Sequence, residues 1–483
     1  MNTAWEVVIG MECHVELQTR SKMFCGCDVS FGAAPNTLCC PVCLGLPGAL
    51  PVPNEKAIEG ILRIGSALGC RLVDYSEFHR KNYFYPDLPK NYQISQYDLP
   101  LCVDGALEIF SEERTVQIGI TRVHMEEDTG KSRHLASDGR IHDASHSLLD
   151  FNRSGVPLVE IVSEPDIRSA DQARSYAVEL QRVVRALGIS DARLEEGSMR
   201  FDVNVSVRRE DQANLGTRAE VKNVNSLRSL HRAILYERDR QIELLETGRE
   251  VIQDTRHWNE GRGLTVSMRS KEESEDYRYF QEPDLVPIVV SDDWRAEVVD
   301  SLPELPAVRR RRYLDVGLDV QLANSIGDDS ALSKMFDEVL TDGGDPLTSA
   351  NWLTGEVVAY LRKENKDLED TALSAGYLVQ LIRMVASNEL STSAAKEVLG
   401  GVMAGEGDPA KISRERDLIQ ISDESVLEAA VSEVLLANSE AVERMRAGDM
   451  KLVGFLVGQV MKATRGKADP RRVSELVRAA AEV

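Results

Sequence analysis

Two carboxylates and an imidazole alternate with apolar residues within residues 7–18, which read VVIGMECHVELQ. Glu12, His14 and Glu16 fall on one side of this pattern, because side chains two positions apart in a β-strand point to the same face. At that spacing Glu12 and His14 lie about 7 Å apart along the strand. Oxygen ligands of this kind suit Mg²⁺, so the pattern predicts a strand whose polar face takes part in a hard-cation site.

Three further segments show the same alternation: residues 199–208 (MRFDVNVSVR), residues 218–222 (RAEVK) and residues 116–128, which end in HMEED. Their polar positions include Asp202 and Glu220. If the four strands share a sheet, their polar faces form a carboxylate-rich floor that can hold a nucleotide phosphate through Mg²⁺. A solvated sheet face is the simpler explanation of any one strand, and the cation site is favoured because four strands repeat the pattern.

The acidic end of residues 116–128 leaves one assignment open. Alternation is interrupted between Ile120 and Val123, so the pattern does not decide whether Glu126 or Glu127 faces the floor. A β-bulge, in which a strand carries one extra residue, would re-aim either side chain.

Two close cysteine pairs form a second candidate site. Cys25 and Cys27 are followed, after twelve residues, by Cys40 and Cys43, in a region rich in Pro and Gly. This spacing predicts a tetrahedral Cys₄ zinc knuckle, a structural site with no open coordination position. Cys39 is a spare thiol that could replace Cys40, and a loop of reduced cysteines is the alternative explanation.

Residues 78–100 are aromatic, basic and interrupted by prolines, which indicates a loop with extended pieces. The basic side chains are candidates for phosphate contact: Arg80, Lys81 and Lys90. The aromatic side chains are candidates for stacking on a nucleotide base: Tyr83, Phe84, Tyr85 and Tyr92. A well-packed structural loop explains this composition equally well.

The chain has 483 residues, enough for roughly two to four domains, and its 57 Lys and Arg against 79 Asp and Glu give a net charge of −22. This acidity argues against non-specific coating of nucleic acid but allows local basic patches. No apolar run reaches the length of a membrane span, and all eight cysteines lie at or before Cys102, unlike a secreted disulfide framework. We therefore expect a cytoplasmic protein without membrane association.

The order of the expected elements indicates an α+β chain. A short buried strand at residues 156–162 contains Glu160, which must be paired or functional in so apolar a run. Helices are expected at residues 169–187 and 226–247, and strand and loop return before Pro287.

Helical patterns dominate after Pro306. We expect helices at residues 307–316, 330–342, 349–364, 372–387 and 392–399, then a flexible linker at residues 401–409. A last helical unit runs from residue 422 to the end. From residue 451 it has seven basic residues against three acidic, a local charge of +4 that suits a polyanion. A helix pair with incidental charge is the simpler explanation of that excess.

The chain contains no P-loop, no Gly-rich dinucleotide fingerprint, no kinase catalytic-loop signature and no GxSxG.

Ten segments, spread over nearly the whole chain, are distinctive: VIGMECHVEL, CPVCLGLPGALPVPN, RKNYFYPDLPKNYQISQYD, TRVHMEEDTGKS, DFNRSGVPLVEIVSEPDIRS, EEGSMRFDVNVSVR, TRAEVKNVNS, DYRYFQEPDLVP, NWLTGEV and VGFLVGQVMKATRGKADP. In these segments the sequence strongly resembles the B subunits of the bacterial aspartyl/glutamyl-tRNA amidotransferase family.

The resemblance implies an α+β fold in three parts. A glutamine-synthetase-like antiparallel β cradle would span residues 1–302, with the zinc knuckle at residues 25–43. An all-helical domain would span residues 303–410, and a small helical tail domain at residues 411–483 would contact tRNA. The resemblance also implies a heterotrimer with an amidase (A) subunit, which frees ammonia from glutamine, and a small C subunit.

The family's magnesium and kinase site, carried over residue by residue, falls on one set of residues: Glu12, His14, Glu127, Asp202 and Glu220. We assign ATP binding to Arg80, Lys81 and Tyr83. Contact with tRNA is assigned to five basic residues of the tail: Lys462, Arg465, Lys467, Arg471 and Arg472. The cofactors implied are ATP, Mg²⁺ and structural Zn²⁺.

In the implied reaction, ATP converts the side-chain carboxylate of Glu-tRNA(Gln), Asp-tRNA(Asn) or both into an acyl phosphate. Ammonia from the amidase then displaces phosphate and leaves an amide. Two other interpretations use the same features. A complete small-molecule ligase of the glutamine-synthetase class would need neither the basic tail nor the long helical region. A zinc-stabilised tRNA-binding scaffold would leave the acidic floor unused.

Overall fold

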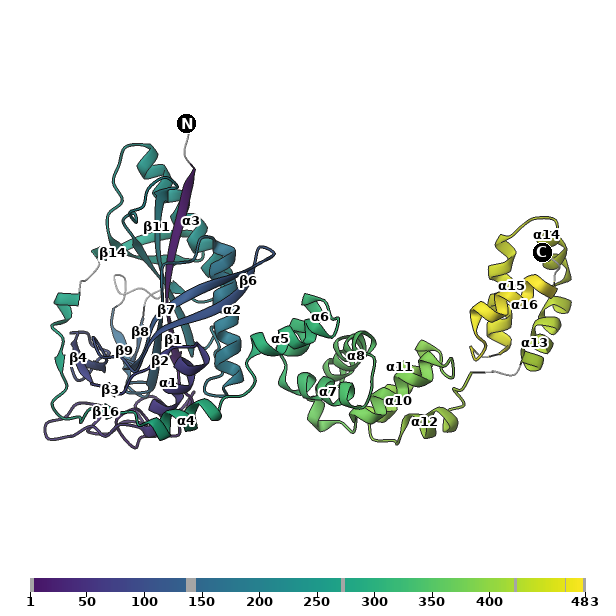
Figure 1. The fold of residues 1–483 in the computed structure, drawn as a ribbon, viewed down its shortest axis with the longest axis horizontal. Helices are drawn as coiled ribbons and strands as arrows, with labels where there is room; N and C mark the ends of the chain where they lie inside the picture. Colours follow the sequence, from purple (N-terminus) through teal and green to yellow (C-terminus); the bar gives the residue numbers. More distant parts are fainter. Residues whose placement is uncertain (1–3, 136–144, 271–273, 421–423, 465, 481–483) are drawn as a thin grey trace. The chain divides into compact units, whose positions relative to one another are not determined.

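The computed structural model describes residues 4–135, 145–270, 274–420, 424–464 and 466–480 (Figure 1). The chain divides into two compact units, Met1–Ala307 and Val308–Val483. The first unit combines a large sheet with helices and the second is helical, which confirms the α+β class. Within the described ranges, no helix is long and apolar enough to cross a membrane.

A twelve-stranded sheet forms the centre of the first unit among the described residues. All four strands expected to share a polar floor belong to it: β1 (Trp5–Glu16), β7 (Arg114–Glu127), β11 (Met199–Arg209) and β12 (Ala219–Val224). The central strand β1 pairs antiparallel with β11 on one side and with β10 (Pro157–Ser163) on the other. On its far side β10 pairs with β7. The sheet therefore aligns the alternating segments as neighbours or near neighbours.

The remaining strands extend this sheet at both ends. Beyond β12 it continues through β13 (Asp254–Asn259), which is parallel to β12, and β14 (Leu264–Ser270). Beyond β7 it continues through β5 (Tyr92–Ser95), β4 (His79–Asn82) and β15 (Phe280–Gln281), with β6 (Cys102–Ser111) and β2 (Arg71–Leu72) on a branch. Two small sheets pair β3 (Tyr75–Ser76) with β16 (Ile288–Val289), and β8 (Lys131–His134) with β9 (Ser147–Asp150).

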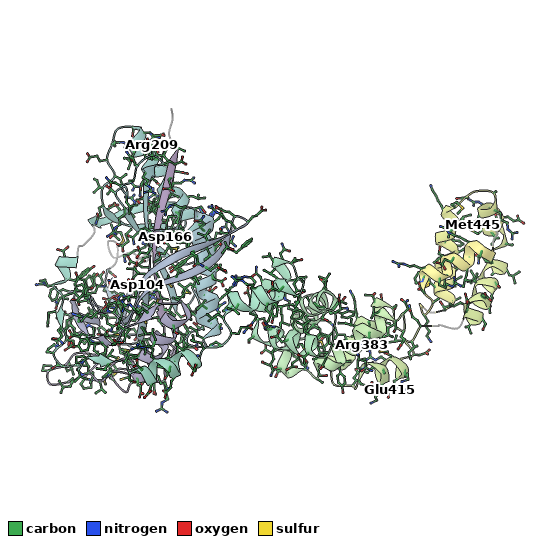
Figure 2. All side chains as sticks on the ribbon, in the orientation of Figure 1. Asp104, Asp166, Arg209, Arg383, Glu415 and Met445 are labelled. Carbon is green, nitrogen blue, oxygen red and sulfur yellow. The ribbon has the colours of Figure 1, made fainter. Side chains whose placement is uncertain are left out.

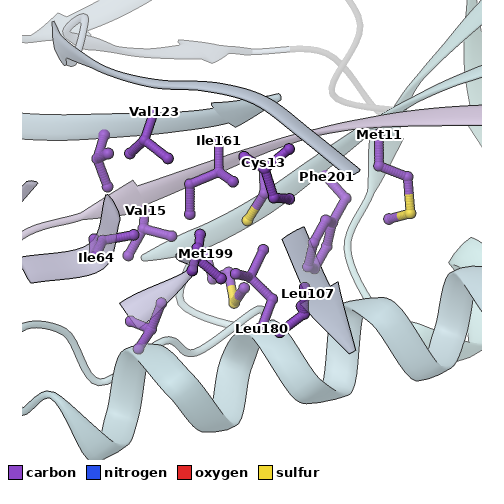
Figure 3. Packing of buried hydrophobic residues seen from close by; sticks show 14 of the residues in the cluster. Met11, Cys13, Val15, Ile64, Leu107, Val123, Ile161, Leu180, Met199 and Phe201 are labelled. Atoms are coloured by element: carbon purple, nitrogen blue, oxygen red, sulfur yellow. The ribbon is translucent and has the colours of Figure 1, made fainter. Parts of the chain in front are cut away.

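Alternation along β1 separates a buried face from a polar one, as predicted. Met11, Cys13 and Val15 are at most 1% exposed and pack in one cluster with Phe201 and Met199 of β11 (Figure 3). Among the described residues, four helices contribute to the same cluster: α1 (Glu55–Ala67), α2 (Ala170–Ala186), α3 (Leu227–Glu246) and α4 (Asp292–Asp300). With one face covered by helices, the opposite face of β1 is left for polar side chains.

Helices α2 and α3 confirm the predictions for residues 169–187 and 226–247. Each follows a serine whose side-chain oxygen accepts a backbone N–H three residues later, Ser169 from Gln172 and Ser226 from Ser229. The first unit also contains the 3₁₀ turn η2 (Ser274–Tyr277) and the helix α4 (Asp292–Asp300).

Strand β7 carries a bulge at the interruption seen in its sequence. In its pairing with β10, Arg122 lies opposite Val162, but the next pair joins Ile120 to Ser163. One extra residue, Thr121, is therefore inserted into β7.

After this bulge the period of two resumes. Val123 and Met125 are fully buried in the core. His124 and Glu126 consequently face the polar floor, while Glu127 falls on the opposite side of the strand.

The described residues of the second unit form two hydrophobic clusters. The first involves helices α5 (Pro306–Asp315), α6 (Val320–Gly327), α7 (Ser330–Thr341), α8 (Pro346–Trp352), α9 (Val358–Glu364), α10 (Ala375–Ala386), α11 (Thr392–Met403) and α12 (Pro409–Glu415), with a 3₁₀ turn at Leu368–Asp370. The second involves α13 (Glu424–Ala437), α14 (Ser439–Arg446), α15 (Lys451–Ala463) and α16 (Pro470–Ala480). Met445 of α14, which is labelled in Figure 2, is fully buried in this second cluster.

Two predictions for the second unit need correction. The helix expected at residues 349–364 is interrupted by a π turn at Leu353–Val357, which separates α8 from α9. The linker expected at residues 401–409 is wrong at its start, because α11 continues to Met403 and Gly401 is buried. A Cβ atom on Gly401 would lie 3.2 Å from the side chain of Ile412, so this glycine permits close packing rather than flexibility.

Candidate functional site

Three carboxylates from neighbouring strands converge on the polar face of β1. Glu12 lies directly opposite Asp202 of β11, and Asn204 of β11 lies opposite Glu220 of β12. One oxygen atom from each of Glu12, Asp202 and Glu220 lies within 4.8 Å of the other two, close enough to share one cation. These three residues are called the Glu12 cluster.

Hydrogen-bond donors orient two members of the Glu12 cluster. Nδ2 of Asn204 donates to Oε1 of Glu12 at 3.0 Å. The hydroxyl of Thr255, from β13, donates to Oε2 of Glu220 at 2.9 Å. Donors of this kind fix the carboxylate rotamers, as the outer residues of metal sites commonly do.

Negative charge dominates the Glu12 cluster. Burial, and then the carboxylates of Glu160, Glu220 and Asp202, raise the pKa of Glu12. Nζ of Lys222 lies 2.7 Å from Asp202 and 3.5 Å from Glu220. Burial would lower the pKa of Lys222, but these two carboxylates raise it. Three carboxylates beside one ammonium form a donor set that fits a divalent cation.

A second group of candidate cation ligands lies along the same face. His14 is directly opposite Glu160 of β10, and its Nε2 is 3.5 Å from Oε2 of Glu160 and 3.8 Å from Oε2 of Glu126. One ligand atom from each of these residues lies within 4.8 Å of the others. Both carboxylates are buried. His14, Glu126 and Glu160 are called the His14 cluster.

Opposite charges hold the His14 cluster together. Burial would lower the pKa of His14, but Glu160 and Glu126 raise it to about 9. Burial would raise the pKa of Glu126, but Lys81, with His124 and His14, lowers it to about 2. A metal-bound imidazole is neutral, so a cation bound here takes the place of the His14 proton. One imidazole and two carboxylates fit a divalent cation.

Four of the five residues predicted for the magnesium site lie in these clusters: Glu12, His14, Asp202 and Glu220. The fifth, Glu127, points away from the floor. Its Oε1 accepts the backbone N–H of Ile94 at 2.8 Å and contacts Nζ of Lys90. Glu126 stands beside His14 instead, because the bulge at Thr121 sets which side chains of β7 face the floor.

Glu160 was not among the predicted ligands. The sequence signal was its position as the one carboxylate in an apolar strand, Pro157–Ser163. Its place opposite His14 depends on the register between β1 and β10, two strands that are far apart in the sequence.

Lys81, on β4, borders the His14 cluster. Its Nζ lies 3.6 Å from Oε1 of Glu126 and 5.1 Å from the ring centre of Tyr277. The ring of Tyr83 stacks on Tyr85, with centroids 6.0 Å apart, and lies 6.4 Å from Tyr277. An ammonium among aromatic rings is an arrangement that suits a nucleotide.

Arg80, the neighbour of Lys81, is not brought to the clusters. Its guanidinium donates to both carboxylate oxygens of Glu282, at 2.6 and 2.8 Å, and lies 4.2 Å from the ring centre of Tyr92. Glu282 is only 1% exposed. This bidentate ion pair fastens β4 to the segment around β15, so the phosphate-binding role predicted for Arg80 lacks geometric support.

The two cysteine pairs form a four-sulfur site. The Sγ atoms within 4.8 Å of one another are those of Cys25, Cys27, Cys40 and Cys43. Hydrogen bonds from the Cys25 thiol and the Cys40 backbone, with the nearby Lys22 ammonium, lower the pKa of Cys43 to about 4. Cys39 lies outside this group, with its thiol next to Asn152. Four thiolate sulfurs fit the tetrahedral coordination of zinc.

The basic residues predicted to bind tRNA lie around α15 and α16. Lys462 and Arg471 are exposed. Lys467 contacts Asp417, and Arg472 contacts both Glu424 and Glu475. Arg465 lies outside the described residues.

Two family models match the chain, one described as the GatB/GatE catalytic domain over residues 7–296 and one as the GatB domain over residues 334–480. The chain is also 49% identical over 475 residues to the aspartyl/glutamyl-tRNA(Asn/Gln) amidotransferase B subunit from Thermodesulfovibrio yellowstonii, a match covering 98% of each chain. The chain belongs to this family of amidotransferase B subunits.

Other members of the family agree over the same length. The B subunit from Acaryochloris marina is 47% identical over 481 residues, 98% of this chain and 97% of that one. The B subunit from Frankia casuarinae is 48% identical over 480 residues, 98% of this chain and 95% of that one. Membership of the B-subunit family confirms the resemblance seen in the sequence and makes the chain part of a glutamine-dependent carbon–nitrogen ligase.

Proposed function

We propose that the polar face of the first unit is the ATP- and Mg²⁺-dependent site that activates and amidates the amino acid on Glu-tRNA(Gln), Asp-tRNA(Asn) or both. One observation carries this proposal. The Glu12 cluster and the His14 cluster lie on one sheet face, with Lys81 beside the second of them. Adjacent cation sites next to an ammonium form an arrangement that suits a triphosphate.

The residues of the site have separate tasks in this reaction. Glu12, Asp202 and Glu220 hold one cation, and His14, Glu126 and Glu160 hold the other. Bound there, Mg²⁺ supplies charge neutralisation for the phosphates. Lys81 contacts a phosphate oxygen, and the neighbouring tyrosines, including Tyr83, stack on the adenine. The substrate carboxylate attacks the γ-phosphorus, the bond to the bridging oxygen breaks and ADP leaves, so that an acyl phosphate is formed. Ammonia then attacks the acyl carbon, displaces inorganic phosphate and loses a proton, which leaves the amide.

The other parts of the chain take supporting roles. We propose a glutamine-synthetase-like cradle at residues 1–302, a helical domain at residues 303–410 and a tail at residues 411–483 that contacts tRNA phosphates. The four cysteines hold a structural zinc. An amidase (A) subunit and a small C subunit complete the proposed heterotrimer. The amidase is needed because the chain carries no recognisable amide-hydrolysing nucleophile motif.

The two alternative interpretations fit less well. A small-molecule ligase has no use for a basic tail, and the relatives that match the full length are named for action on tRNA. A non-catalytic scaffold leaves two oriented carboxylate clusters without a task.

The decisive experiment uses the assembled complex with mischarged tRNA, γ-labelled ATP and no ammonia source. Wild-type complex should release labelled phosphate in a tRNA-dependent manner, and Glu12→Gln and Glu220→Gln should abolish that release. Glu6→Gln is the matched control, since Glu6 lies on the same strand but pairs with Arg208 instead. If the folded Glu12→Gln complex still released phosphate in a tRNA-dependent manner, the kinase step would lie elsewhere.

A further inference from the structure

His124 lies on the polar floor although neither the expected ligand set nor the two clusters include it. It is two residues before Glu126 on β7 and therefore on the same face of the strand. Register pairs join His14 to Glu160 and Glu160 to His124, so the three side chains form one row across β1, β10 and β7. Directly opposite residues bring their side chains into contact.

The contacts of His124 are made to the carboxylates of the His14 cluster. Its Nε2 lies 3.3 Å from Oε2 of Glu160 and 3.9 Å from Oε1 of Glu126. The side chain is only 3% exposed. Its other ring nitrogen, Nδ1, is buried and has no hydrogen-bond partner among the described residues. Within those residues, the polar contacts of the imidazole are therefore with the two carboxylates.

His124 does not belong to the group whose ligand atoms can meet at one cation, which is His14, Glu126 and Glu160. It stands at the end of the row, with Glu160 between it and His14. A buried carboxylate without such a neighbour can adopt other rotamers and loses part of its affinity for a cation. Outer partners of metal ligands typically contribute about 10- to 100-fold in metal affinity.

We propose that His124 is a positioning residue, which holds the carboxylates of Glu160 and Glu126 in the orientation that binds a divalent cation with His14. The Nε2–H group of His124 donates to Glu160 and reaches no ligand position itself. The inference rests on the proposed function, because it presupposes a cation in the His14 cluster.

Two polar substitutions, whose side-chain amides lie at different distances from the backbone, test this role. In His124→Gln the amide nitrogen comes close to the position of Nε2, whereas in His124→Asn it comes close to that of Nδ1. The probe is Mn²⁺ alone, titrated into the full-length chain and followed by electron paramagnetic resonance. We expect His124→Asn to weaken binding at one site about 10- to 100-fold, and His124→Gln to restore most of the lost affinity.

Two comparisons make the outcome specific. His231→Asn is the matched control, since His231 also pairs with a carboxylate, Asp171 at 3.3 Å, but on helices of the covered face. Circular dichroism establishes that each variant is folded. Glu160→Gln should lose the same Mn²⁺ site.

Each possible result tests either the cation site or the role of His124. If Glu160→Gln binds Mn²⁺ as the wild type does, the cation site itself, and with it the proposed function, is wrong. If Glu160→Gln loses the site but His124→Asn retains wild-type affinity, only the role of His124 is wrong. Equal loss in His124→Gln and His124→Asn also overturns it, because a positioned donor would then not be sufficient.

Discussion

Replacing Glu126 and Glu127 with glutamine, one at a time, separates the cation floor from the opposite side of β7. The two residues are neighbours in the sequence, but Glu126 contacts His14, His124 and Lys81, while Glu127 contacts Lys90. Glu126→Gln should therefore weaken cation binding, and Glu127→Gln should lower stability instead.

The expected losses of Mn²⁺ affinity and of stability follow from the surroundings of each carboxylate. The pKa of Glu126, lowered from 4.5 to about 2, corresponds to about 3 kcal/mol of net attraction to its positive neighbours. Lys81 contributes most to that attraction and stays in place, but a divalent cation carries twice the charge of the His14 proton that it replaces, so its attraction to Glu126 is of the same order. Glu126→Gln should thus raise the dissociation constant for Mn²⁺ about 100- to 300-fold.

Glu127→Gln leaves a buried ammonium without its carboxylate, because the Lys90 side chain is only 6% exposed. Breaking a buried pair in this way costs about 3–5 kcal/mol. The rings of Tyr92 and Phe24 lie 5.4 and 5.9 Å from Nζ of Lys90, and their attraction favours the lower end of that range. Affinity for Mn²⁺ should stay unchanged.

Both quantities are measured on the same preparations, by Mn²⁺ titration with electron paramagnetic resonance and by urea-induced unfolding followed by tryptophan fluorescence. The first unit holds Trp5, Trp258 and Trp294, so fluorescence reports mainly on the unit that contains the floor. Loss of Mn²⁺ binding in Glu127→Gln, with retention in Glu126→Gln, would refute the assignment of faces on β7.

Three further outcomes are expected. Burial and then Asp128 raise the pKa of Glu16 from 4.5 to about 8, so its contribution to stability is complete below about pH 4.5 and is lost as the pH rises through 8. Glu16→Gln should remove this decline, which amounts to about 1–2 kcal/mol of unfolding free energy once solvent screening is allowed for. The unfolding free energy of both proteins is measured at pH 5 and pH 9, and an equal pH dependence in the two would contradict the prediction. Elemental analysis should find one zinc per chain. Cys43→Ser should eliminate the zinc and lower Tm while the Mn²⁺ sites persist. Zinc-free wild-type protein purified without chelator would refute the zinc site. Deleting residues 422–483 should weaken tRNA binding and reduce its salt dependence without affecting glutamine hydrolysis by the partner, and unchanged tRNA affinity would exclude this role.

The sequence was sufficient to predict features that depend on local periodicity. Alternation in residues 7–18 identified a half-buried strand, and the structure places it at the centre of the sheet. The same pattern placed Glu12 and His14 on the polar face, where the structure brings them into the two clusters. Such periods follow from backbone geometry alone and need no knowledge of partners.

Other features depend on contacts between distant segments. Glu160 joins His14 only through the register of β10, and Thr255 reaches Glu220 from a parallel strand. The partner of Arg80 is Glu282, which no local pattern connects to it. The bulge at Thr121 arises from the pairing with β10, so the sequence indicated an irregularity there but not which carboxylate it would turn to the floor.

In the proposed function, the lysines beside the clusters explain how so acidic a floor can fold and why it should bind nucleotide and cation together. Lys81 neutralises part of the negative charge of Glu126, and Lys222 neutralises part of the negative charge of Asp202 and Glu220. The phosphates of ATP attract the same ammonium groups. A lysine drawn to a phosphate leaves its carboxylate with less positive charge nearby, which raises the affinity of that carboxylate for a cation. Because such coupling is reciprocal, a bound cation in turn releases the lysines for phosphate, so each ligand strengthens the binding of the other.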